Sequence, residues 1–245
     1  MSVTPSSSSS ITEVSIPTAD NALQGILAVP EGTGPWPAVV MVHEVYGIEA
    51  NMRAHAERLA SLGYLAVMPD LYSRGGMRKC LNATFRALQA GQGQAFDDVE
   101  ATKRWVTARP DCTGKVGVIG FCMGGAFALQ LAARGYDVSS VNYGMLPKDL
   151  DAALDGACPI IGSYGKKDLS LKGAAAKLDA ALTRHGIEHE VTEYEGASHA
   201  FLNPGPAGPK VMSAIMNRVA GFGPAPAQAE QAWQRIDAFF QAHLR

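Results

Sequence analysis

Paired cysteines, an excess charge of one sign and nucleotide-binding loops are all missing from this chain of 245 residues. Its four cysteines form no CxxC pair and no zinc-like spacing, so we expect reduced thiols in a cytoplasmic protein. The 21 basic and 23 acidic side chains give a formal net charge of −2, which excludes a polybasic binder of nucleic acid or membrane surfaces. Neither GxxxxGK[ST] nor a GxGxxG turn after the first strand is present, so we expect no cofactor.

Signals for membrane insertion or export are also scarce. The N-terminus has no basic and no apolar region of a signal peptide, and residues 1–10 are predicted to form a flexible serine-rich tail. Residues 116–133 carry no charge and are long enough to span a membrane. Four glycines crowd the first half of this run and Arg134 follows it, so strand, turn and helix are the better interpretation. We therefore expect no membrane partner.

The composition supports a sizeable core in one unit. Hydrophobic residues make up 47% of the chain and charged residues 18%, which excludes global disorder. No linker divides the sequence, and α/β chains of this length often keep one core. We expect residues 11–245 to form a single domain.

Two hydrophobic patterns alternate along that domain. Alternating runs at residues 11–16 and 23–29 predict an antiparallel hairpin. Continuous apolar runs, typical of strands buried on both faces, follow at residues 38–42, 65–68, 116–119, 141–143 and 159–161. Helical patterns occupy residues 52–62, 96–108 and 174–182, and a C-terminal helix carries the stripe Ala229, Trp233, Ile236 and Phe240. These patterns predict a doubly wound, mostly parallel α/β sheet.

The sequence GFCMG at residues 120–124 matches the nucleophile elbow, with cysteine where serine usually stands. Such a turn lifts Cys122 above the sheet in a strained backbone, so Gly120 and Gly124 must lack Cβ atoms. The turn also places Cys122 at a helix N-terminus, which favours a thiolate. We expect the backbone N–H of Met123 to be the first donor to a carbonyl oxyanion. A buried, inert cysteine in a tight turn is the alternative.

A cysteine nucleophile needs a base and an acid that orients the base, and elbow hydrolases supply them in the order nucleophile, acid, histidine. Asp168 and His199 each follow a predicted strand in that order. The alternatives are a helix-capping Asp168 and a solvated His199. His185 and His189 have HxxxH spacing, but Gly186 breaks the helix that a zinc site would need.

The loop after the first buried strand supplies the second oxyanion N–H in elbow hydrolases, here that of Val45. Glu44 is unusual in this place, because its charge opposes both a thiolate and a developing oxyanion. A solvated loop glutamate is the alternative.

Four segments together resemble the dienelactone hydrolase family of carboxymethylenebutenolidase-like enzymes: HEVYGI at residues 43–48, MPDLYSR at 68–74, GFCMGG at 120–125 and SHAF at 198–201. The resemblance covers residues 11–245 and implies the α/β-hydrolase fold. It further implies Cys122 as nucleophile, His199 as base, Asp168 as orienting acid and Glu44 hydrogen-bonded to the resting thiol. The implied activity is hydrolysis of lactones or small carboxylic esters through a thioester acyl-enzyme.

One position departs from the family pattern. Typical members have an arginine four residues after the catalytic histidine to bind a substrate carboxylate, and this chain has Asn203. Arg74, Arg78 and Arg86 are candidates to replace its charge, with solvated surface charge as the alternative. Candidate residues for lining the substrate pocket are the aromatic side chains near the predicted site, with plain packing as the alternative: Tyr46, Tyr72, Phe121 and Phe201.

Two further functions remain open from the sequence. The first is a binding or sensor protein that keeps the fold without turnover, suggested by Asn203 in the place of the arginine. The second is a peroxide-sensing Cys122, although the sequence shows no resolving thiol for it.

Overall fold

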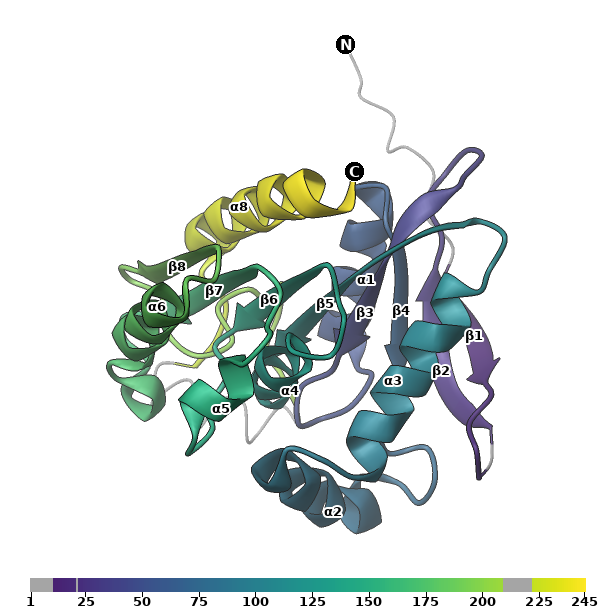
Figure 1. The fold of residues 1–245 in the computed structure, drawn as a ribbon, viewed down its shortest axis with the longest axis horizontal. Helices are drawn as coiled ribbons and strands as arrows, with labels where there is room; N and C mark the ends of the chain where they lie inside the picture. The colour runs from purple at the N-terminus through teal and green to yellow at the C-terminus, as the bar shows by residue number, and fades with distance from the viewer. Residues whose placement is uncertain (1–10, 21, 209–221) are drawn as a thin grey trace.

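The strands form one mixed sheet in the order β1-β2-β4-β3-β5-β6-β7-β8 (Figure 1). The computed structural model describes residues 11–20, 22–208 and 222–245, and the predicted serine-rich tail lies outside them. The antiparallel pairs are β1 with β2 and β2 with β4, and every other pair is parallel. The strands are β1 (Ile11–Ile16), β2 (Leu23–Ala28), β3 (Trp36–Val42), β4 (Leu65–Pro69), β5 (Cys112–Phe121), β6 (Val138–Asn142), β7 (Ile160–Gly165) and β8 (His189–Tyr194). The predicted N-terminal hairpin and mostly parallel sheet are confirmed.

Helices cover both faces of this sheet (Figure 1). They are α1 (Ala50–Ser61), α2 (Met77–Ala90), α3 (Gln94–Thr107), α4 (Met123–Leu131), α5 (Leu150–Leu154), α6 (Ala174–His185) and α8 (Pro226–Leu244). Alternate residues of β3 point to opposite sides. Val39 and Met41 pack in the cluster with α1 and α8, whereas Val40 and Val42 pack with α3 and α4. Burial of β3 on both faces explains its continuous apolar sequence.

Helices α2 and α5 and the starts of strands β5 and β6 differ most from the sequence-based expectation. Helix α2 lies in a segment for which we predicted no helix, and only Thr84 and Leu88 of its residues are buried. Strand β5 begins at Cys112, four residues before the predicted start. The apolar pattern missed these four residues because three of them are exposed and they form no apolar run. Residues 116–133 are divided between β5 and α4, and no helix in the described ranges is long and apolar enough to cross a membrane.

Candidate active site

Cys122 occupies a sharp turn between β5 and α4. Its backbone has φ 54° and ψ −114°, a conformation that residues other than glycine rarely adopt. A Cβ atom on Gly120 would lie 1.9 Å from the carbonyl oxygen of Gly124, and one on Gly124 would lie 2.0 Å from that of Val42. Both contacts are far below van der Waals distance, so only glycine fits. The steric argument for the GxCxG spacing therefore holds in the structure.

Asp168 and His199 form a buried pair at the same edge of the sheet. His199 Nδ1 lies 2.6 Å from Asp168 Oδ2, and the other carboxylate oxygen accepts hydrogen bonds from Ser170 N–H at 3.0 Å and Ser170 O–H at 2.5 Å. Burial favours the neutral acid, but these hydrogen bonds outweigh it and lower the pKa of Asp168. An ionised Asp168 with both oxygens held fixes the imidazole and leaves Nε2 for chemistry.

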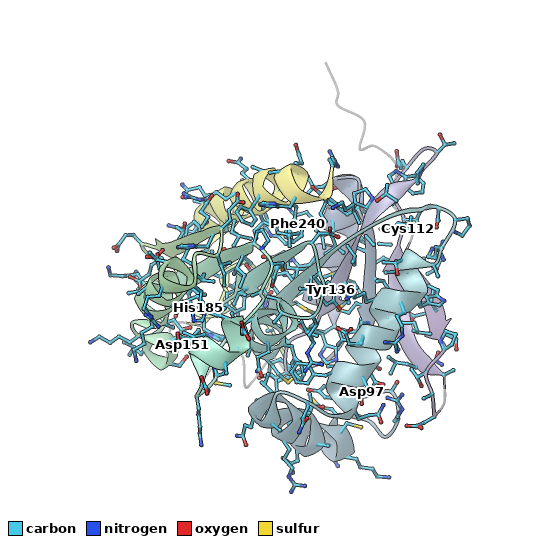
Figure 2. All side chains as sticks on the ribbon, viewed as in Figure 1. Asp97, Cys112, Tyr136, Asp151, His185 and Phe240 are labelled. Atoms are coloured by element: carbon cyan, nitrogen blue, oxygen red, sulfur yellow. The ribbon has the colours of Figure 1, made fainter. Side chains whose placement is uncertain are left out.

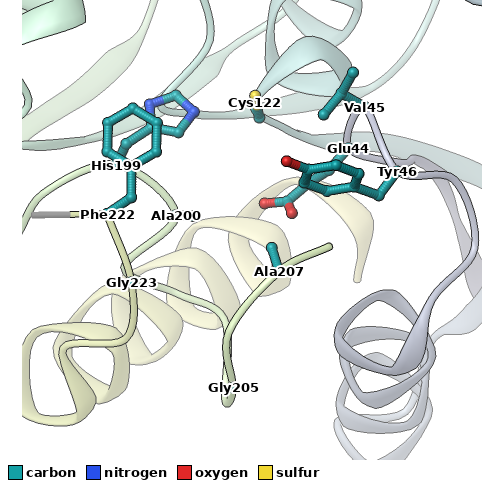
Figure 3. A pocket seen from close by; sticks show the side chains of 10 residues that line it. All are labelled: Glu44, Val45, Tyr46, Cys122, His199, Ala200, Gly205, Ala207, Phe222 and Gly223. Carbon is teal, nitrogen blue, oxygen red and sulfur yellow. The ribbon is translucent and has the colours of Figure 1, made fainter. Parts of the chain in front are cut away.

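His199 and Cys122 line one cavity (Figure 3). Burial lowers the pKa of His199, but its hydrogen bonds to Asp168 and Cys122 outweigh burial and raise the pKa above its ordinary value. The ring of Phe222 stacks on the imidazole with centroids 4.8 Å apart, and the ring of Tyr143 contacts it at a tilt of 59° with centroids 5.1 Å apart. The imidazole is thus held by two rings and a carboxylate.

Glu44 belongs to a buried polar network that the sequence did not reveal. Asn203 Nδ2 donates to Glu44 Oε1 at 3.2 Å and Oε2 at 3.1 Å, and Tyr143 O–H donates to Oε1 at 3.3 Å. The amide oxygen of Asn203 lies 3.0 Å from His55 Nε2 on α1. Burial raises the pKa of Glu44 to about 7, although the hydrogen bond from Asn203 opposes this shift. The carboxylate faces the cavity beside Cys122 (Figure 3), and its expected hydrogen bond to the resting thiol stays a prediction.

His43 holds the loop that carries Glu44 and Val45. Leu71 N–H donates to His43 Nε2 at 3.2 Å, so the proton of the neutral ring is on Nδ1 and donates to the Glu44 carbonyl at 2.7 Å. Burial lowers the pKa of His43, which favours this neutral form. The hydroxyl of Tyr72 donates to the Val45 carbonyl at 3.0 Å. These contacts fix the backbone whose N–H we predict as an oxyanion donor.

Met123 is the first residue of α4, so its backbone N–H has no acceptor within the helix. Cys122 N–H, in contrast, donates to the Asn142 carbonyl at 3.0 Å and is not available. Val45 lines the cavity. The two expected oxyanion donors, the backbone N–H groups of Met123 and Val45, stay a prediction.

The cavity has a volume of about 200 Å³. Of the four aromatic residues expected around it, Tyr46 lines it. The other three pack into the protein: Tyr72 against His43, Phe121 on His55 and Phe201 beside Tyr143. The described lining consists of Glu44, Val45, Tyr46, Cys122, His199, Ala200, Gly205, Ala207, Phe222 and Gly223.

The arginine candidates are not brought to this cavity. Arg74 forms an ion pair with Asp98 and donates to Thr18 Oγ1 at 3.1 Å. Arg78 and Arg86 are exposed on α2. Asn203, expected to contact substrate, is 2% exposed and points to Glu44 and His55 instead. Asn203 therefore lies behind Glu44 and is not part of the described lining of the cavity.

The two histidines with HxxxH spacing lie elsewhere. His185 Nε2 is 2.9 Å from Asp151 Oδ1 on the surface (Figure 2), and His189 Nε2 is 3.4 Å from Asp179 Oδ1. Three or more histidine, cysteine or carboxylate side chains placed to hold a metal ion occur nowhere in the described part of the chain.

The sheet order, the elbow and the residues that meet above it define an α/β-hydrolase fold. A crystal structure from Klebsiella pneumoniae, of a protein assigned as a dienelactone hydrolase, has a TM-score of 0.78 and 26% identity, covering 94% of this chain and 98% of that chain. The dienelactone hydrolase of Anabaena variabilis shares the fold with a TM-score of 0.73 and 21% identity, over 96% of this chain and 99% of its own.

Sequence comparison identifies the family within the α/β-hydrolase fold. The model of the dienelactone hydrolase family matches residues 23–244. The carboxymethylenebutenolidase of Pseudomonas putida is 32% identical over 207 residues, which is 80% of this chain and 87% of the relative. The chain belongs to the dienelactone hydrolase family.

Proposed function

We propose that this protein hydrolyses lactones or small carboxylic esters through a thioester on Cys122. The family and the carboxymethylenebutenolidase relatives support ester or lactone hydrolysis. The observation that carries the cysteine mechanism is the shared cavity: Cys122 and His199 line it, and Asp168 holds the imidazole through its other nitrogen.

In the first half-reaction, His199 Nε2 accepts the thiol proton and the sulfur attacks the carbonyl carbon. The tetrahedral oxyanion accepts hydrogen bonds from the backbone N–H groups of Met123 and Val45. The carbon–oxygen bond to the leaving group then breaks, and that oxygen takes the proton from His199. The product of this step is the thioester, or, for a lactone, the ring-opened thioester.

In the second half-reaction, His199 takes a proton from water, and the hydroxide oxygen attacks the thioester carbonyl. The carbon–sulfur bond breaks, the acid is released and the proton returns to sulfur. Asp168 stays ionised throughout and stabilises the imidazolium that forms twice per turnover.

Rapid-quench intact-mass measurement tests this mechanism. An activated ester such as 4-nitrophenyl acetate should add one acetyl mass to the wild type within the burst, and the adduct should map to Cys122. Cys122→Ala should show neither adduct nor turnover. Cys112→Ser is the matched control, because Cys112 is a free thiol at the start of β5, outside the cavity, and both adduct and turnover should persist.

Turnover at the wild-type rate in Cys122→Ala, or wild-type turnover without an adduct, would contradict the cysteine mechanism. Saturable ligand binding without hydrolysis of any activated ester or lactone would favour a binding protein on the same fold.

A further inference from the structure

His55 on α1 has a buried imidazole that the proposed mechanism does not use. The residue is 2% exposed, and its ring stacks on Phe121 with centroids 4.4 Å apart and an interplanar angle of 14°. Trp233 of α8 contacts the same ring with centroids 5.4 Å apart. Phe121 is the last residue of β5 and directly precedes Cys122. Aromatic packing therefore holds the imidazole next to the residue that leads into the elbow.

The polar edge of this ring is directed at Asn203. His55 Nε2 lies 3.0 Å from the amide oxygen of Asn203, so the ring must carry a proton on Nε2 to donate to it. Burial lowers the pKa of His55 to about 4, so the ring is neutral and has a single N–H. The one donor of the imidazole is thus the group that binds the amide.

The amide of Asn203 passes this contact on to Glu44. With its oxygen bound by His55, the NH₂ group faces the carboxylate and donates to Oε1 at 3.2 Å and to Oε2 at 3.1 Å. The reverse orientation would set the amide oxygen against an ionised carboxylate, and both groups only accept hydrogen bonds. Asn203 and Glu44 are each 2% exposed, so bulk water cannot easily replace these hydrogen bonds. The donor of His55 fixes the amide, and the amide fixes the carboxylate.

From these contacts we propose that His55 is a positioning residue that acts through Asn203 to restrain the thiol of Cys122. The amide keeps the carboxylate of Glu44 fixed beside the sulfur while no substrate is bound. The inference rests on the proposed function, in which Cys122 is the nucleophile, and names a residue that regulates it.

The restraint follows from the charge of Glu44. Glu44 and Cys122 line the same cavity (Figure 3), and a carboxylate charge held there opposes formation of a thiolate. Without the donor of His55, the amide of Asn203 binds Glu44 less firmly. The carboxylate then takes up a proton or turns away more readily, and the thiol becomes more reactive.

Two variants separate the donor of His55 from the packing of its ring. His55→Phe keeps an aromatic ring against Phe121 and removes the N–H, whereas His55→Gln loses the ring and keeps an N–H donor of similar reach. The readout is the rate at which iodoacetamide, an uncharged reagent, alkylates Cys122, followed by peptide mass. We expect this rate to rise about two- to tenfold in His55→Phe, the effect of one hydrogen bond, and to stay within about twofold of the wild type in His55→Gln.

Cys112 is the internal control, because this free thiol lies at the start of β5 and is not among the described residues that line the cavity. Its alkylation rate should be the same in all variants. Asn203→Leu removes the amide and should raise the rate at Cys122 at least as much as His55→Phe. Combining the two substitutions should add nothing further, because both break the same path. Urea unfolding of each variant confirms that folded proteins are compared.

A rate at Cys122 that rises as much in His55→Gln as in His55→Phe, or more, would overturn the inference, because packing on Phe121 would then set the reactivity. An unchanged or slower rate in His55→Phe would also overturn it, as would additive effects of His55→Phe and Asn203→Leu. If His55→Phe does not fold, an unchanged rate in Asn203→Leu overturns the inference by itself. Wild type that hydrolyses no activated ester or lactone would refute the proposed function instead, so turnover and alkylation distinguish the two failures.

Discussion

At the residue scale, hydrogen bonds from neighbouring residues fix the position of the reactive side chains. Asp168 is the clearest case: one oxygen binds His199 and the other accepts two hydrogen bonds from Ser170. Ser170 itself is exposed, so its hydroxyl contributes to the site without contributing to the core.

Ser170→Ala should therefore reduce catalysis and spare the fold. Loss of one hydrogen bond to a charged group is worth about 1.5–3 kcal/mol, so we expect kcat/KM to fall about tenfold or more and the free energy of unfolding to fall by no more than this amount. Ser61→Ala removes a comparable exposed hydroxyl, which donates to the Arg58 carbonyl far from the site, and should have wild-type activity. Equal activities of the two variants would contradict the role given to Ser170.

The sequence identifies residues whose signal is local. Cys122 stands between two glycines at fixed spacing, and Asp168 and His199 follow strand-like runs, so their meeting at one sheet edge follows from parallel pairing. The Asn203 side chain, in contrast, forms hydrogen bonds to residues far away in the sequence: Glu44 is 159 positions away and His55 is 148 positions away. No periodicity encodes such contacts, and no motif distinguishes His55 within the helical pattern at residues 52–62.

At the element scale, the elbow depends on close approach between β3, β5 and α4. Gly124→Ala would place a Cβ atom 2.0 Å from the Val42 carbonyl oxygen, in backbone that cannot yield like a flexible side chain. We expect a loss of about 3 kcal/mol or more in unfolding free energy, at the upper end for overpacking, and loss of esterase activity.

Gly156→Ala is the control for this substitution. Gly156 has φ +72° and nothing within 4 Å of an added Cβ, so only backbone strain of about 1–2 kcal/mol is expected. Thermal and urea unfolding of both variants measure the difference. Similar losses for the two would show that the close approach at Gly124 is not the constraint.

Strands were predictable where burial coincides with an apolar sequence. Strands β3 and β4 are buried along their length and have apolar sequences, whereas β6 is equally buried but has the sequence VSSVN, so only its second half was predicted. Helix α2 begins after Gly76 without a side-chain cap and buries only Thr84 and Leu88, so neither capping nor periodicity marked it.

At the scale of the whole molecule, the buried carboxylate of Glu44 couples folding to pH. Its pKa is raised from 4.5 to about 7 by burial, so the native state holds this proton more tightly than the unfolded state. The contribution of Glu44 is therefore most favourable below pH 4.5 and is lost as the pH rises through 7. The loss is on the order of 3 kcal/mol, because each pKa unit corresponds to about 1.4 kcal/mol.

Glu44→Gln removes this titration, so its stability relative to the wild type should increase between pH 5 and pH 8. Urea unfolding at both pH values measures the change, which we expect to be about 2–3 kcal/mol in favour of the variant. Groups that titrate in both proteins cancel in the comparison. A constant difference between Glu44→Gln and the wild type would mean that Glu44 does not titrate in this range.

The bend at residue 122 is imposed by its surroundings: the missing Cβ atoms of Gly120 and Gly124, and the bond from its own N–H to Asn142. None of these constraints involves the sulfur. The backbone constraints at this position are therefore the same for a side chain that ends in oxygen or selenium as for the thiol of cysteine. A change of reactive atom would need no change in the loop that presents it.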